Sequence, residues 1–226
     1  MPRLLDLSHA VEAGMVTYKG LPGPVIRDHL SREASRPLYA GGTTFQIGKI
    51  EMVANTGTYV DAPSHRWADG ADLASLSLDL LAGREGICIA APHSRGLAVD
   101  GDFFEGKEIE GKAVLVSTGW SAFWGTPSYF HRSSHLTSSA ASLLVARGAA
   151  IVGIDSHNID DTDDKTRPVH SILLRAGIPV VEHLCNLEAL PESGFRFYAV
   201  PVKVVGMGTF PVRAFAEVAS APRARP

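Results

Sequence analysis

The chain is organised around one stretch, Asn55-Thr56-Gly57-Thr58-Tyr59-Val60-Asp61-Ala62-Pro63-Ser64-His65, which follows an apolar run of strand character at residues 50–54. Gly57 and Pro63 argue against a helix, because glycine loosens the backbone and proline pushes the residue before it into an extended conformation. In an extended segment, side chains two or four residues apart share a face, so Asn55, Tyr59, Asp61 and His65 point roughly the same way. A carboxylate and an imidazole on one rigid face suit a metal site or a general acid/base pair, while the competing interpretation is a structural turn with His65 merely exposed.

The composition indicates a protein with ample material for a core and no surface for polyanions. Of the 226 residues, 45% are hydrophobic, the formal net charge is −3, and no stretch concentrates Lys or Arg. We therefore expect a small-molecule substrate and neither nucleic acid nor membrane as a partner. No apolar run reaches the length of a membrane span and the first residues lack a signal segment, which predicts a cytoplasmic protein. Cys88 and Cys185 lie in apolar surroundings typical of buried thiols.

Short strands and helices follow one another without strict alternation. Strand patterns occupy residues 4–7, 44–54, 86–91, 113–117, 150–154, 178–182 and 195–205. The clearest helix is predicted from Thr137 to Arg147, with Thr137 as N-cap and Gly148 as the stop; a short helix over 73–81 and a helical turn over 170–175 are also expected. Residues 27–43 are polar and predict a loop or flap. The whole pattern predicts one α/β domain over residues 1–226 with a mixed sheet, its last residues, 219–226, forming a flexible tail.

Three further acid or imidazole groups stand where predicted strands end or loops begin, namely Asp155, His170 and Glu182. Folds of the α/β class usually place functional groups at such positions. Each group alone is explained by a structural role. Together with Asp61 and His65, they form a set of nitrogen and oxygen ligands suited to a divalent ion.

The central stretch resembles the signature of the cyclase family of metal-dependent hydrolases, which includes bacterial kynurenine formamidase and isatin hydrolase. That signature is His-x-Gly-Thr-His-x-Asp-x-Pro-x-His, and five further segments of this chain are similar to the family in order and spacing: residues 6–9, 117–120 with 129–130, 152–155, 170–174 and 182–187. The resemblance implies a mixed, partly barrel-like sheet flanked by helices, of the swivelling β/β/α type. It also implies a homodimer or homotetramer.

The resemblance carries a ligand set with it, from which this sequence departs at two positions. In the dimetal members, the first two signature histidines and the aspartate bind one ion, and the aspartate binds the other with residues matching His170 and Glu182. Here Asn55 and Tyr59 stand in place of the two histidines. An amide is a poor zinc ligand, and a phenol must first lose a proton of pKa about 10. The expected cofactor is therefore one divalent ion, zinc or manganese, held by Asp61, His170 and Glu182.

The function implied is metal-dependent hydrolysis of a small amide, lactam or lactone that is aromatic or cyclic. N-formylkynurenine, an intermediate of tryptophan catabolism, is the family's default substrate. The ion would activate a water, His65 would serve as general acid/base, and Tyr59 would donate a hydrogen bond to the developing oxyanion. Asn55, Trp67 and Trp120 are expected to contact the substrate.

Two alternatives stay open at this point. A metal-independent cyclase, dehydratase or isomerase would use Tyr59, Asp61 and His65 as a hydrogen-bonded acid/base site and need no ion. A non-catalytic binding protein descended from the enzyme would explain the two lost ligands. It would not explain why Asp61, His65, His170 and Glu182 are all present.

Overall fold

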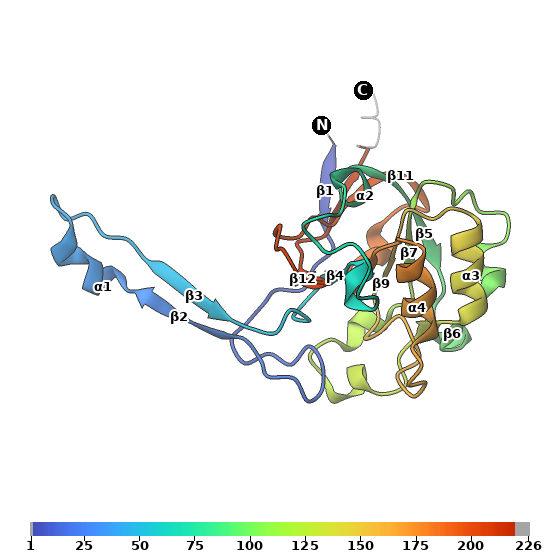
Figure 1. Cartoon of the computed structure of the whole chain (residues 1–226), viewed down its shortest axis with the longest axis horizontal. Coiled ribbons are helices and arrows are strands. Elements are labelled where there is room, and N and C mark those ends of the chain that lie inside the picture. Colours follow the sequence, from blue (N-terminus) through green and yellow to red (C-terminus); the bar gives the residue numbers. More distant parts are fainter. Residues whose placement is uncertain (1, 220–226) are drawn as a thin grey trace, which may run out of the picture.

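A mixed β-sheet forms the centre of the protein in its computed structural model, which describes residues 2–219 (Figure 1). Within these residues, the nine strands lie in the order β1 (Arg3–Asp6), β13 (Phe215–Val218), β11 (Ser193–Tyr198), β5 (Arg84–Ala90), β7 (Ala113–Ser117), β9 (Ile151–Ile154), β10 (Val180–Glu182), β4 (Tyr59–Asp61) and β12 (Thr209–Pro211). Strands β5, β7, β9 and β10 are parallel, and the flanking pairs are antiparallel. The sheet confirms the predicted α/β class, while the predicted tail, apart from Ala219, lies outside the described residues.

The two longest helices, α3 (Ser138–Ala146) and α4 (Pro168–Arg175), pack against each other and cover one face of the sheet (Figure 1). Helix α3 begins as predicted, because the Thr137 side chain accepts a hydrogen bond from the backbone N–H of Ala140. It ends before Gly148, whose φ of 70° only glycine adopts without strain.

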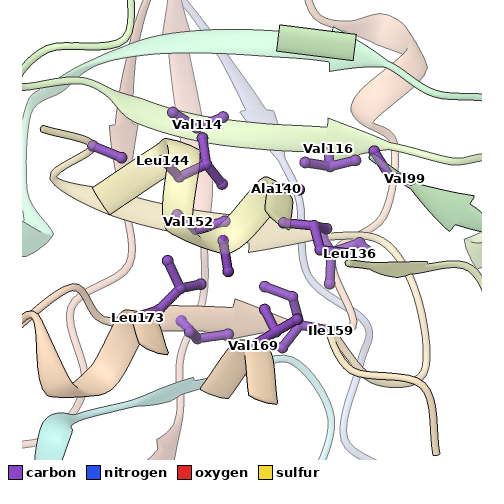
Figure 2. Packing of buried hydrophobic residues seen from close by; sticks show 14 of the residues in the cluster. Val99, Val114, Val116, Leu136, Ala140, Leu144, Val152, Ile159, Val169 and Leu173 are labelled. Atoms are coloured by element: carbon purple, nitrogen blue, oxygen red, sulfur yellow. The ribbon is translucent and has the colours of Figure 1, made fainter. Parts of the chain in front are cut away.

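Alternate side chains of the central strands supply two cores, one on each face of the sheet. Val114 and Val116 point into the cluster beneath α3 and α4, with Leu144 and Leu173 (Figure 2). Leu115, between them in sequence, packs in the opposite cluster with residues of β1, β11 and β13. This period of two is the expected behaviour of a strand buried on both faces. It makes the centre of the sheet a rigid support for the groups at its edge.

A long arm projects from this body (Figure 1). It consists of β2 (Val25–Leu30), α1 (Arg32–Ser35), a 3₁₀ turn at Arg36–Leu38 and β3 (Ile47–Glu51), with β2 and β3 paired antiparallel. The prediction of a loop over 27–43 is wrong for residues 27–38, which form the end of β2, α1 and the 3₁₀ turn, because polar residues also suit a ribbon that faces solvent on both sides. It is confirmed for residues 39–43, which form neither helix nor strand. Every residue of β3 and five of the six in β2 are exposed.

The remaining elements are short. They are α2 (Leu78–Leu81), the pair β6 (Ala98–Val99) and β8 (His135–Leu136), and 3₁₀ turns at Pro63–His65, His93–Arg95, Gly101–Phe104, Trp120–Phe123, Pro127–Phe130 and Leu187–Ala189. The helix predicted over 73–81 forms only its last turn, and the strand predicted over 195–205 ends at Tyr198, just before Pro201. Among residues 2–219, no helix has the length and apolar character needed to cross a bilayer.

Candidate active site

The register of three neighbouring strands brings four polar side chains to one face of the sheet. Tyr59 of β4 lies opposite Glu182 of β10, and Asp61 of β4 lies opposite Thr209 of β12. Because Tyr59 and Asp61 are two residues apart, they point to the same face, and their cross-strand partners meet them there. The Tyr59 hydroxyl donates a 2.7 Å hydrogen bond to Glu182 Oε2, and the Thr209 hydroxyl donates to Asp61 Oδ1.

Helix α4 supplies the imidazole of this group, and Asp160 fixes its orientation. The Asp160 carboxylate accepts hydrogen bonds from the backbone N–H groups of Val169, at 2.6 Å, and His170, at 3.0 Å. It therefore satisfies the free donors at the start of α4 that the N-cap residue, Arg167, leaves unpaired. The same carboxylate lies 2.6 Å from His170 Nδ1, which assigns the ring proton to Nδ1 and turns Nε2 toward the sheet.

Asp61, His170 and Glu182 converge with one ligand atom each, all within 4.8 Å of one another. His170 Nε2 lies 3.5 Å from Asp61 Oδ2 and 3.6 Å from Glu182 Oε1. The three side chains are buried, and within the described residues Asp61 Oδ2 has no hydrogen-bond partner. A buried carboxylate oxygen without a donor is costly, and it is explained when a cation accepts its lone pair.

The electrostatics of this group call for positive charge. Burial lowers the pKa of His170, but the carboxylates of Glu182, Asp160 and Asp61 outweigh burial and raise it to about 10. Burial raises the pKa of Glu182 to about 7, against the opposing effect of His170. A proton on His170 thus balances the acids, and a divalent ion coordinated by the same atoms would take over that role. The donor set of one imidazole and two carboxylates fits such an ion.

His65 stands beside this group with one ring nitrogen free. Thr209 Oγ1 donates to Asp61, so its oxygen accepts from His65 Nδ1, 2.7 Å away. This assigns the proton to Nδ1 and leaves the lone pair on Nε2. Gly208 permits the approach, because a Cβ at that position would lie 2.5 Å from the backbone nitrogen of His65. His65 therefore has the tautomer of a general base.

Tyr59 belongs to a buried hydrogen-bond chain. His183 Nε2 lies 3.2 Å from the Tyr59 hydroxyl, and His183 Nδ1 lies 2.8 Å from the Tyr129 hydroxyl. Since Tyr59 donates to Glu182, its oxygen accepts from His183 Nε2, and Tyr129 donates to Nδ1. Burial, then the charge of Glu182, raises the pKa of Tyr59 well above its usual range, and burial keeps His183 neutral by lowering its pKa. Tyr59 is thus a neutral donor, unlike the phenolate a metal would require.

The group opens onto a cavity of about 300 Å³. Its lining comprises Tyr18, Leu21, Asn55, Tyr59, His65, Arg66, Asn158, Arg167, His170 and Glu182. This volume lies at the lower end of the range for small-molecule sites and suits a substrate of about one aromatic ring. A larger cavity of about 760 Å³ lies elsewhere, between residues 9–19 and 124–131, and its lining does not include the three converging side chains.

The structure separates the other residues predicted for the site. Asn55 lines the cavity, while Trp67 and Trp120 do not. Trp67 packs against the core beneath α4 and donates to the carbonyl of Ser171, and Trp120 is buried with its indole N–H on the carbonyl of Tyr129. Asp155 uses both oxygens to hold the backbone N–H groups of Thr118, at 2.8 Å, and Gly119, at 2.8 Å. Its role is structural.

Several contributors were not identified from the sequence. Asp160 stands in an acidic loop, and its spacing of ten residues from His170 gave no periodic signal. Thr209 acts through a cross-strand contact that no local pattern encodes. Arg66 follows the signature directly, and Arg167 stands just before α4. Their proximity in sequence to His65 and His170 was the one indication that they lie at the site.

Comparison with known proteins matches residues 5–161 to the family described as "Putative cyclase". The kynurenine formamidase of Erythrobacter litoralis is 29% identical over 166 residues, which cover 73% of each chain. Isatin hydrolase A from Labrenzia aggregata, solved with benzyl benzoate, superposes with a TM-score of 0.83 at 21% identity, covering 97% of this chain and 94% of that one. A potential metal-dependent hydrolase with cyclase activity gives a TM-score of 0.79 at 24% identity, covering 98% and 100%.

Proposed function

The chain belongs to the cyclase family, and from this membership we propose that it hydrolyses the C–N bond of a small aromatic or cyclic amide or lactam, or the ester bond of a lactone. The names of its relatives, kynurenine formamidase and isatin hydrolase, support a hydrolase of non-peptide C–N bonds. One observation carries the proposal to this chain. Asp61, His170 and Glu182 form a buried group, and its members His170 and Glu182 line the same cavity as His65.

Asp61, His170 and Glu182 would hold one divalent ion, zinc or manganese, through the atoms that converge in the structure. When bound, the ion polarises the carbonyl of the substrate and lowers the pKa of water at the site. Asp160 supports this role, because its hydrogen bond to Nδ1 keeps Nε2 of His170 available. Only a single ion is proposed, since Tyr59 and Asn55 supply no anionic or imidazole ligand at the other position.

His65 is the proposed general acid/base. Its free Nε2 takes a proton from the attacking water and returns it to the leaving nitrogen as the C–N bond breaks. Thr209 positions the ring by accepting from Nδ1 while it donates to Asp61. Through this link, the carboxylate of Asp61 also stabilises the imidazolium that forms during the transfer.

Tyr59 acts on the reaction through Glu182 in this proposal. Its hydroxyl proton is directed at Glu182 Oε2, while Oε1 accepts from the backbone N–H of Ile159 at 2.7 Å. These two donors hold the carboxylate in a fixed orientation. The geometry therefore favours a positioning role over the direct oxyanion contact expected from the sequence.

The test is a turnover screen on the protein supplied with zinc or manganese. N-formylated aromatic amines, isatin-like lactams and aryl lactones should include at least one substrate, with His65→Ala nearly inactive on it. Absence of hydrolysis across all three classes, in protein shown to contain metal and to be folded, would refute the proposal.

We also propose that the arm of residues 25–51 packs on a second copy of the chain. A two-stranded ribbon alone is marginally stable in water. This one exposes a set of large apolar side chains: Val25, Ile26, Leu38, Tyr39, Phe45, Ile47 and Ile50. Apolar surface of this kind marks association sites, and the arm projects away from its own body (Figure 1). A homo-oligomer built through the arms would bury these residues.

A further inference from the structure

Two arginines line the cavity without an acidic partner. Arg66 and Arg167 both contribute to its lining, and neither makes an ion pair among the described residues. Arg175 offers a contrast nearby. Its guanidinium lies 5.1 Å from the ring centre of Trp67, like that of Arg66, and it binds both oxygens of Asp69 at 3.0 Å. Among the described residues, neither guanidinium at the cavity is therefore in ion-pair contact with a carboxylate.

Arg66 is held in place from two sides. Its guanidinium carbon lies 4.5 Å from the ring centre of Trp67, and its Nε donates to Ser171 Oγ at 3.0 Å. Trp67 is itself fixed, because its indole N–H donates to the carbonyl of Ser171 at 3.2 Å. These contacts use Nε and the face of the guanidinium. Both terminal nitrogens are left for a ligand, in the fork that suits a carboxylate.

Arg167 is fixed as firmly, at the beginning of the same helix. Its backbone has a φ of 50°, a left-handed conformation that a non-glycine residue adopts only where its surroundings impose it. Nη1 donates to the carbonyl of Asp161 at 2.8 Å, and Nη2 donates to the Tyr18 hydroxyl at 3.3 Å. The Ser171 hydroxyl donates to the Arg167 carbonyl at 2.8 Å while it accepts from Arg66, so one serine links the two arginines.

We infer that the substrate carries an anionic substituent, a carboxylate, that Arg66 and Arg167 bind while the scissile bond lies at Asp61, His170 and Glu182. The inference rests on the proposed hydrolase and names its substrate class. A preorganised pair of guanidiniums binds a carboxylate at little entropic cost. The arginine pair contributes to substrate specificity, because a neutral analogue of the substrate has no carboxylate to bind the two guanidiniums.

The experiment compares substrates that differ only in the carboxylate, formanilide and N-formylanthranilate, in the wild type and the variants Arg66→Met, Arg66→Lys and Arg167→Gln. Arg95→Met is the matched control, since Arg95 is also exposed and lies 5.2 Å from an aromatic ring centre, that of Phe103, away from this cavity. Binding of anthranilate and of aniline is measured in parallel by calorimetry, which requires no turnover. Folding of each variant is checked by circular dichroism.

Arg66→Met should lower kcat/KM for N-formylanthranilate by about 10- to 100-fold, the range of a hydrogen bond between charged groups, and change formanilide by less than about twofold. Arg66→Lys should restore part of the loss, Arg167→Gln should shift selectivity in the same direction, and Arg95→Met should match the wild type. Anthranilate binding should weaken with the same variants. Equal losses on both substrates, or none, would overturn the inference.

The two proposals fail in different ways. If neither these two formamides nor the lactams and lactones of the turnover screen are hydrolysed but anthranilate binding depends on Arg66, the anion site stands and the hydrolase proposal is wrong. If formanilide is hydrolysed and anthranilate binding ignores Arg66 and Arg167, the hydrolase stands and the anion site is wrong. Anthranilate binding that a chelator abolishes and the arginine variants leave unchanged would place the carboxylate on the metal, and would also overturn the inference.

Discussion

Replacing Tyr59 with phenylalanine tests the buried hydrogen-bond chain on which the site depends. The substitution keeps the ring and removes the hydroxyl that joins Glu182, at 2.7 Å, to His183, at 3.2 Å. Loss of a hydrogen bond to a charged group costs about 2 kcal/mol, and a buried N–H left on His183 costs about 1–2 kcal/mol more. We therefore expect Tyr59→Phe to lower the free energy of unfolding by about 3–4 kcal/mol.

The comparison variant is Tyr129→Phe, which removes the donor to His183 Nδ1, 2.8 Å away. Both groups of that bond are neutral, so its loss costs about 1 kcal/mol, and the buried acceptor left unpaired on Nδ1 adds about 1 kcal/mol, for an expected loss of about 2 kcal/mol. Urea unfolding of chelator-treated protein measures both losses without a contribution from metal binding. The slope of the unfolding free energy against urea concentration should be the same in both variants as in the wild type. A loss below about 1 kcal/mol for Tyr59→Phe, or one no larger than that of Tyr129→Phe, would refute the assigned direction of the chain.

Three further predictions concern the proposed acid/base, a buried histidine and the arm. His65→Ala should lower kcat by about 10²–10⁴-fold while metal content stays unchanged, and a smaller loss would remove His65 from the role of acid/base. Burial lowers the pKa of His157 to about 4 from 6.5 in the unfolded chain, so its contribution to stability is complete above pH 6.5 and is lost as pH falls toward 4. His157→Phe should therefore remove about 3 kcal/mol of the acid destabilisation measured by unfolding at pH 7 and pH 4, and parallel pH profiles would contradict this. Ile26→Asp and Phe45→Asp on the arm should lower the mass measured by light scattering. The control Leu78→Asp, at a 64% exposed position on α2, should leave the mass unchanged. An unchanged mass in all three variants would exclude an arm-mediated oligomer.

Local signals in the sequence predicted much of the fold. The helix expected over 137–147 is α3, because its threonine cap and glycine stop act within a few residues of the helix itself. The strands expected over 113–117 and 150–154 correspond to β7 and β9, where continuous apolar runs are buried on both faces. The family inferred from the signature and the α/β class inferred from the pattern of strands and helices are confirmed.

The first half of the arm and the end of β11 were not predicted, for one physical reason, whereas β3 lies within the strand predicted over 44–54. Residues 25–30 lack the alternation of a half-buried strand, because neither face of the ribbon is buried within this chain. Residues 199–205 have apolar side chains but no ladder partner, and Val205 is 83% exposed. A pattern of hydrophobicity predicts strands that are buried against the chain's own core. It does not predict where strands begin and end in segments that lie outside that core.

For the site, the reactive residue types could be predicted from the sequence, but the hydrogen bonds that orient them could not. Asp61, His170 and Glu182 converge in the structure, and their role as metal ligands stays a prediction. The roles of Asp160 and Thr209 depend on where α4 begins and on the register of β4 with β12, which are tertiary facts. Trp67 was expected at the substrate, but it lies outside the cavity lining, with its ring centre 4.5 Å from the guanidinium carbon of Arg66.

The central claim is that Asp61, His170 and Glu182 hold one divalent ion needed for hydrolysis. Elemental analysis of the purified protein, beside its amide-hydrolysing activity, tests this most directly. We expect one zinc or manganese ion per chain, lost in His170→Ala together with the activity, and restoration of chelator-treated wild type by either metal. Full activity in metal-free protein would contradict the claim and favour a metal-independent reaction at Tyr59, Asp61 and His65, and two ions per chain would contradict the single site.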